Sequence, residues 1–171
     1  NGDILALSGT VRGKNTVATN FTAGKSVEIV GNITRDDTPL GATPTSNRDK
    51  LGIVASQIRI SDDPTKIPSA LTTHLYLYAA MFADDQWLVE SAGTRSPFRG
   101  EIFGGIQSRQ HAPHYNTFSG LTVIRGMAGP TGNGTPRIVG DINMEKDPPP
   151  MFPSSEEGKM VIRYWREEPI V

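Results

Sequence analysis

The sequence has no cysteine, no long apolar run and almost no net charge. Without cysteine, disulfide bonds, thiolate metal sites and cysteine nucleophiles are excluded over these 171 residues. The longest mostly apolar stretch, LYLYAAMFA, is far shorter than the roughly 18 residues that a membrane-spanning helix needs. A formal net charge of −1 favours no class of partner. Function therefore has to be predicted from patterns within the chain.

Helical periodicity is nearly absent as well. Short alternating runs of apolar and polar residues appear instead, and Gly, Asn, Asp and Pro bound them. The chain has 18 glycines and 13 prolines, and only 36% of its residues are hydrophobic. This composition is typical of a turn-rich β protein, so the sequence predicts an all-β fold.

One pattern returns along the chain. It consists of an apolar residue, any residue, two apolar residues, a pair of small or polar residues, and an outgoing strand. The copies begin at Ile4, Val27, Leu51, Leu75, Gly100 and, in a weaker form, Leu121. Their starts differ by 23, 24, 24, 25 and 21 residues. A period of this size is typical of stacked structural repeats.

The small pairs at the centre of the pattern predict tight corners, because a corner has little room for a bulky Cβ. These pairs are Ser8-Gly9, Gly31-Asn32, Ala55-Ser56, Ala79-Ala80 and Gly104-Gly105. We interpret each copy as one coil of a right-handed parallel β-helix, a β-solenoid of about six coils, with the apolar residues pointing inward. A β-sandwich is the alternative, but it does not require small pairs at near-constant intervals.

The C-terminal part of the sequence differs from the repeats. Three consecutive prolines predict that residues 147–153, DPPPMFP, are extended. Residues 159–165, KMVIRYW, alternate like a closing strand and are expected to pack along or across the last coils. The predicted organisation is therefore one domain, with coils over residues 1–140 and a Pro-rich segment with a capping strand over residues 141–171.

An ordered set of motifs resembles the solenoid-like C-terminal region of PilX-type pilus assembly proteins, which are minor-pilin-like surface proteins of bacteria. The motifs are GNITRDD, LGIVASQIRI, AAMFA, GEIFGGIQSRQ, and DPPPMFP followed by YWREE. The resemblance implies a non-enzymatic module at the bacterial cell surface or outside the cell, carried by a type IV pilus or its assembly machinery. It implies pilus or cell-surface subunits as partners, and adhesion, pilus assembly or DNA uptake as the function.

Pairs of aspartates follow three of the predicted corners. They are Asp36-Asp37, Asp62-Asp63 and Asp84-Asp85. Stacked coils would bring them together along one edge, where their oxygens would suit a Ca²⁺ ion. Two carboxylates also suit the acid and base of a glycosidase, so a polysaccharide-degrading β-helix enzyme is the competing hypothesis. A third interpretation is that these aspartates are turn residues without a ligand.

Arginines are concentrated between residues 94 and 137, where Glu101 is the only acidic residue. The basic residues are Arg95, Arg99, Arg109, Arg125 and Arg137, with Tyr115 among them. Because arginine binds phosphate in a bidentate way and aromatic rings stack on bases, this segment is a candidate DNA-binding strip. The alternative is an ordinary surface whose charges are balanced elsewhere. We assign no catalytic residue, and the main hypothesis is a module that presents a rigid binding face.

Overall fold

A computed structural model of the chain describes residues 2–20, 23–61, 63, 65–67, 74–89, 98–108, 115–118, 121–124, 127–128, 137–152, 154–156 and 159–161. The strands in its first half are β1 (Ile4–Val11), β2 (Lys14–Ala18), β3 (Ser26–Arg35), β4 (Lys50–Ile60) and β5 (His74–Val89). They are followed by β6 (Phe98–Ser108), β7 (Tyr115–Phe118), β8 (Leu121–Ile124), β9 (Met127–Ala128), β10 (Arg137–Val139), β11 (Ser154–Glu156) and β12 (Lys159–Val161). The predicted all-β fold is confirmed, with one addition, the five-residue helix α1 (Ile142–Lys146).

Eight of these strands form one large sheet in the order β1-β3-β4-β5-β6-β10, with β2 on β4 and β9 on β6. Every strand pair in this sheet is parallel. The pairs β7–β8 and β11–β12 are separate antiparallel hairpins. No helix in the part of the chain that the structure describes is long and apolar enough to cross a membrane.

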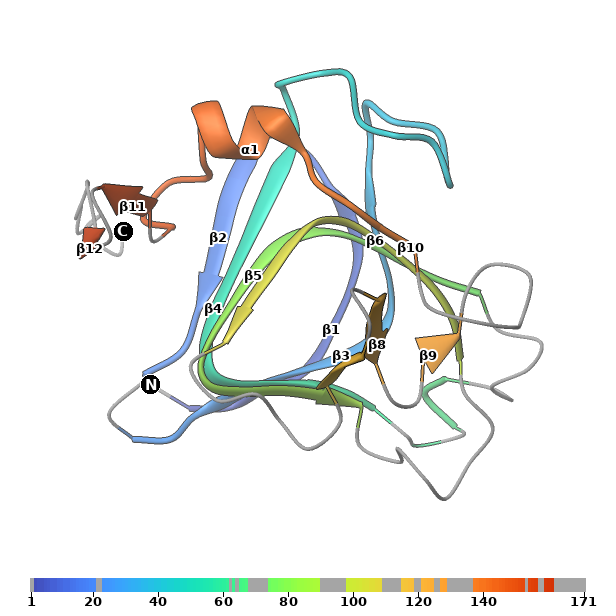
Figure 1. Ribbon diagram of the computed structural model, residues 1–171, viewed down its shortest axis with the longest axis vertical. Coiled ribbons are helices and arrows are strands. Elements are labelled where there is room, and N and C mark those ends of the chain that lie inside the picture. Colours follow the sequence, from blue (N-terminus) through green and yellow to red (C-terminus); the bar gives the residue numbers. More distant parts are fainter. Residues whose placement is uncertain are drawn as a thin grey trace, which may run out of the picture.

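The long strands bend at corners, so that one strand contributes to more than one face of the sheet. Residues 26–29 of β3 pair with the end of β4, while Ile33 of the same strand pairs with Leu77 of β5. The beginning of β4 pairs with β2 instead. Seen down the short axis, β1 to β6 therefore trace a triangular outline around a common interior (Figure 1).

The interior of this outline is filled by aliphatic side chains from all three faces. Leu51 and Ile53 of β4 and Leu75 and Leu77 of β5 are at most 5% exposed, as their first and third places in the repeat predict. They belong to one cluster that also includes Ile29, Ile58, Met81, Trp87 and Ile102. Burying each such aliphatic side chain stabilises the fold by about 1.5–3 kcal/mol.

The repeat copies are not all equivalent, which corrects the predicted stacking. The first two copies stack as expected, because Ile4 pairs with Val27, and so do the fourth and fifth, because Leu75 pairs with Gly100. The third copy does not stack on the second, because Val27 pairs with Ile58 rather than with Leu51.

The reason is that the small pairs mark three different corners of the outline. Residues 31–32 lie between the faces of β3 that pair with β4 and with β5, residues 55–56 divide β4, and residues 79–80 divide β5. Every tight corner favours small residues, so the sequence pattern does not distinguish one corner from another. The number of about six coils stays a prediction. The face that contains the most described strands stacks five of them, β1, β3, β5, β6 and β10.

The corner between residues 104 and 105 shows what such a position requires. Gly104 has φ 141°, and a Cβ there would lie 2.2 Å from the carbonyl oxygen of Ala79. Gly105 has open space around the same position. Only Gly104 of this predicted small pair therefore has to be glycine.

The C-terminal part also departs from the predictions. Pro149–Phe152 form a turn rather than an extended segment, because the Phe152 N–H donates to the Pro149 carbonyl and Met151 has φ 57°. Strand β12 pairs with β11 and not with the large sheet, and residues 162–165 lie outside the described residues. Helix α1 lies at the ends of β2 and β4 where these strands begin (Figure 1), and Lys50, the first residue of β4, binds the Asn143 carbonyl.

Candidate binding site at the first strand

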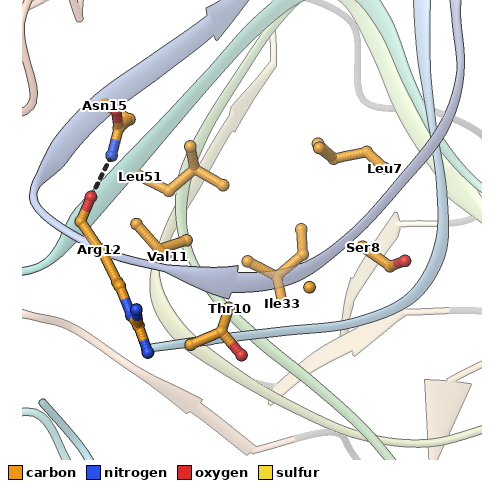
Figure 2. A pocket seen from close by; sticks show the side chains of 9 residues that line it. Leu7, Ser8, Thr10, Val11, Arg12, Asn15, Ile33 and Leu51 are labelled. Carbon is orange, nitrogen blue, oxygen red and sulfur yellow. Dashed lines mark hydrogen bonds between the residues drawn. The ribbon is translucent and has the colours of Figure 1, made fainter. Parts of the chain in front are cut away.

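A pocket of about 400 Å³ lies at β1, where the stacked strands begin. Its lining is apolar in part and polar in part: Leu7, Val11, Ile33 and Leu51, with Ser8, Gly9, Thr10, Arg12 and Asn15. Figure 2 shows the four aliphatic side chains around the opening, and Asn15 Nδ2 donates to the carbonyl oxygen of Arg12 at 2.8 Å. The volume is within the range of about 300–1,000 Å³ that is usual for ligand pockets.

The strand beside this pocket is an edge strand in the described part of the chain. Strand β1 pairs with β3 on one side, in parallel, and no second partner is described for it. Leu5 at its beginning is 62% exposed. An edge strand presents unpaired N–H and C=O groups, which are a template for a further strand.

Polar side chains connect β1 to β3 at both of its ends. Asp3 accepts hydrogen bonds from the backbone N–H of Ser26 at 2.7 Å and from the Ser26 hydroxyl. The hydroxyls of Thr10 and Thr34 lie 2.9 Å apart. These contacts fix the position of β1, the strand that borders the pocket, on β3.

A second polar region joins the large sheet to residues 141–152, and we call it the junction. At its centre, the Arg35 side chain is fully buried and binds the carboxylates of Asp37 at 3.0 Å and Asp141 at 2.9 Å. Asp141 is also the N-cap of α1, because it accepts from the Asn143 N–H at 2.9 Å. The start of the helix is therefore anchored to the end of β3.

Lys50 anchors the other end of α1. Its side chain is fully buried, and its ammonium donates to the carbonyl oxygens of Asn143, at 2.6 Å, and Asp147. The Asn143 carbonyl also accepts from the Asp147 N–H at 3.0 Å, and Asp147 is the C-cap residue of α1, so Lys50 binds the C-terminal end of the helix. Lys14 and Asn47 bind the Asp147 side chain, and a Cβ on Gly52 would lie 2.6 Å from the Phe152 ring. The junction thus lies over β2 and β4, at the first strands of the stack.

Two carboxyl groups of the junction, Asp37 and Asp147, have lowered pKa values. Burial of Asp37 opposes ionisation, but hydrogen bonds from Arg35, Ser46 and Thr38 outweigh it and hold the pKa well below its usual range. Hydrogen bonds from Lys14 and Asn47 lower the pKa of Asp147 to about 2. Burial lowers the pKa of Lys50, and the nearby Asp147 carboxylate limits that shift.

The structure does not bring the predicted aspartate pairs to one edge. Asp36 and Asp37 follow β3, Asp63 follows β4, and Asp84 and Asp85 lie within β5. Asp36 pairs with Arg12 and Arg48, Asp63 accepts from the Thr65 N–H and hydroxyl, and Asp85 accepts from Gln57. Asp62 lies outside the described residues. The expectation that these pairs stack is wrong because they belong to different corners.

A cluster of three or more histidine or carboxylate side chains that would hold a metal ion is not found among the described residues. Asp37, which has the strongest set of partners, is already neutralised by a buried arginine. Its hydrogen bonds are therefore structural in this arrangement.

The candidate DNA-binding strip is described only in part. Arg137 on β10 binds Glu101 at 2.9 Å, and its guanidinium lies 5.5 Å from the centre of the Phe103 ring. Glu101 also lies 3.2 Å from His74. The backbones of Arg99 and Tyr115 belong to β6 and β7, and their side chains are outside the description. Arg95, Arg109 and Arg125 lie outside the described residues altogether.

Sequence reasoning missed the two buried cations, Arg35 and Lys50. A signal was present, because Arg35 ends the run VEIVGNITR and Lys50 directly precedes LGIVA, both in buried strands. Their partners lie 106 and 97 residues away in the chain, at Asp141 and Asp147. Local patterns do not reveal a partner at such a distance.

Comparisons with known proteins give no match, since no family model, no curated protein and no solved structure matches this chain. The resemblance to pilus assembly proteins therefore stays a prediction from the sequence motifs. The pocket lining combines apolar side chains with hydroxyl, amide and guanidinium groups. This arrangement suits an apolar group that is inserted from a partner, next to backbone or anionic groups.

Proposed function

We propose that the chain is a non-enzymatic module, a right-handed parallel β-helix that presents a rigid face to a macromolecular partner. The observation that carries this proposal is the parallel register around the triangular outline, in which β3, β4 and β5 each contribute to two or more faces. A parallel connection between strands of one sheet is right-handed in about 98% of cases, which supports the handedness.

The use of the charged groups supports a structural or binding role over an enzymatic one. Asp37, Asp141 and Asp147 bind buried or half-buried cations of the junction. A glycosidase needs two carboxyl groups that face an open site on either side of a sugar. The pocket at β1 has no carboxylate in its lining.

For the partner, the proposal follows the family resemblance and places the module on the bacterial cell surface, against pilus or surface subunits. DNA is the alternative partner because of the arginines between residues 94 and 137. If DNA is the partner, binding to a duplex weakens as salt rises, and the Arg99→Ala, Arg109→Ala double variant binds more weakly still. Duplex binding that ignores both changes would remove DNA from the proposal.

The enzymatic alternative has a direct test. The 171-residue chain is incubated with acidic polysaccharides, and newly released reducing or unsaturated ends are measured against a heat-denatured control. The proposal predicts no release above that control. Release of ends by the native chain that is lost in Asp84→Ala would overturn it in favour of a polysaccharide-degrading enzyme.

A further inference from the structure

We propose that a second copy of this chain docks on the β1 edge in an antiparallel orientation and closes a two-fold dimer. The inference rests on the proposed β-helix, and it identifies the occupant of the site at its first strand. Four observations support it: the uncharged edge strand, the charges at its two ends, its bend, and the apolar pocket beside it.

Among the described residues, the β1 strand has no lysine, proline or covering segment to protect this sheet edge, although its register against β3 shifts at two places. Its eight residues, ILALSGTV, contain no charge and no proline, and Leu5 is 62% exposed. Natural proteins protect exposed edges with lysine, proline, bulges or a covering segment, because open edges pair with other chains. In the described part of the chain, the covering residues 141–152 contact β2 and β4 instead.

The two residues that flank this strand carry opposite charges, Asp3 before it and Arg12 after it. When two copies of β1 pair antiparallel so that Ile4 faces the second copy's Val11, Asp3 faces the second copy's Arg12. The same contact forms a second time on the other side of the two-fold axis. Charge complementarity of this kind selects one partner and one register.

Both flanking groups keep capacity for such a contact. The Arg12 side chain is 79% exposed and uses Nη2 alone in its ion pair with Asp36, at 3.3 Å. The Asp3 side chain is 35% exposed and binds Ser26 and Lys25. A guanidinium has five N–H donors and a carboxylate has about four acceptor positions, so neither group is saturated.

The bend of β1 is compatible with this two-fold arrangement. Gly9 has φ 126°, and the pairing with β3 shifts its register between Leu7 and Gly9. An axis through this bend places residues 4–7 of one copy opposite residues 8–11 of the other. The two bent strands then follow each other, and the interface is isologous, so it closes at two copies and does not extend into a fibre.

Docking at this edge also covers the pocket. Leu7 and Val11 come from β1, while Ile33 and Leu51 come from the next strands of the stack (Figure 2). These side chains lie at the open end of the apolar interior. Ile33 and Leu51 are already buried, whereas Leu7 and Val11 are half-buried, so a second copy would remove Leu7 and Val11 from water and supply the hydrophobic part of the association.

The first experiment measures the mass of the chain in solution by sedimentation equilibrium as protein concentration rises. We expect a monomer–dimer equilibrium. Leu5→Lys should raise the dissociation constant at least about tenfold, because a lysine inside an edge strand blocks pairing. Leu40→Lys is the matched control, since Leu40 is another exposed leucine, 56% exposed, in the loop between β3 and β4, and it should leave the dimer unchanged.

The second experiment exchanges the flanking charges. Asp3→Arg and Arg12→Asp should each weaken the dimer, and the double variant should restore it, since each cross-contact again joins opposite charges. Far-ultraviolet circular dichroism and the thermal midpoint show whether each variant remains folded. A chain that stays monomeric at all concentrations overturns the proposal and leaves the edge to a segment of a longer chain or to another protein. A dimer that tolerates Leu5→Lys, or a double variant that is not restored, overturns the β1 interface and its register.

Discussion

The junction and the β1 edge differ in which groups they bury and which they leave exposed. At the junction, two fully buried cations, Arg35 and Lys50, bind carboxylate or carbonyl oxygens, and each has a partner within residues 141–147. At the edge, apolar side chains remain accessible and the charges lie only at the two ends of the strand. A buried charge requires a complete set of partners within the fold, whereas an exposed edge strand is solvated by water and can pair with another chain. The difference separates a structural region from the edge that we propose as a binding surface.

The largest effect is expected from Arg35→Met. The substitution leaves the carboxylates of Asp37 and Asp141, which are 6% and 1% exposed, without their buried cation. Breaking a buried ion pair in this way costs about 3–5 kcal/mol of unfolding free energy. Urea denaturation measures it, and Arg12→Met is the control at the edge, where an exposed pair contributes at most about 1 kcal/mol. Equal losses in the two variants would abolish the distinction between the regions.

A smaller effect is expected from a methyl group added at each region. In Gly52→Ala the new Cβ would lie 2.6 Å from the Phe152 ring of the junction, and in Gly31→Ala it would lie 3.2 Å from the Ser8 Cβ of β1. Overpacking at Gly52 should cost about 1–3 kcal/mol. The loss at Gly31 should be smaller, because the β1 side needs a shift of only a few tenths of an ångström. Gly105→Ala, which meets nothing within 4 Å, is the control for both thermal midpoints. A greater loss at Gly31 than at Gly52 would reverse the comparison.

The smallest effect is expected from the acid titration of Asp147. Its pKa is about 2 in the folded chain and near 3.8 in the unfolded chain, so the unfolded chain takes up the proton first as pH falls. The stabilisation from this carboxylate is therefore complete above about pH 4 and is lost as pH falls towards 2. The thermal midpoint of Asp147→Asn should lie below that of the wild type at neutral pH, and the two should converge in this acid range. A difference that stays constant with pH would show that the ionised carboxylate is not what holds the junction.

Much of the fold was predictable from the sequence. Alternation identified the inward residues Leu51, Ile53, Leu75 and Leu77, and the small pairs identified real corners. The register was not predictable throughout, because Gly31-Asn32, Ala55-Ser56 and Ala79-Ala80 satisfy the same steric requirement at three different corners. Copies that start 24 residues apart, at Val27, Leu51 and Leu75, therefore lie on different sides of the outline.

The candidate sites were less predictable than the fold. Asp37 was noticed for its chemistry, but its partner Arg35 is buried only because Asp141, 106 residues away, completes its surroundings. The pocket at β1 depends on Leu7, Ile33 and Leu51 meeting from three strands. Contacts between side chains of different strands depend on the strand register, which the repeat pattern did not determine.

The stacking of strands in this register is the central claim, and one engineered disulfide tests it most directly. Gln57 of β4 and Gln86 of β5 are register partners on neighbouring parallel strands, about 4.8 Å apart, which is within the span of a disulfide. Because the chain has no native cysteine, Gln57→Cys with Gln86→Cys should form one intramolecular disulfide on mild oxidation. Ser26→Cys with Gln86→Cys, which are separated by the intervening strand β4, should form none. Quantitative bridging of the first pair alone, in a chain of unchanged circular dichroism, is the predicted result. Failure of that pair to bridge, or equal bridging of the control pair, would contradict the stacked arrangement and the function proposed from it, whatever the outcome for the dimer.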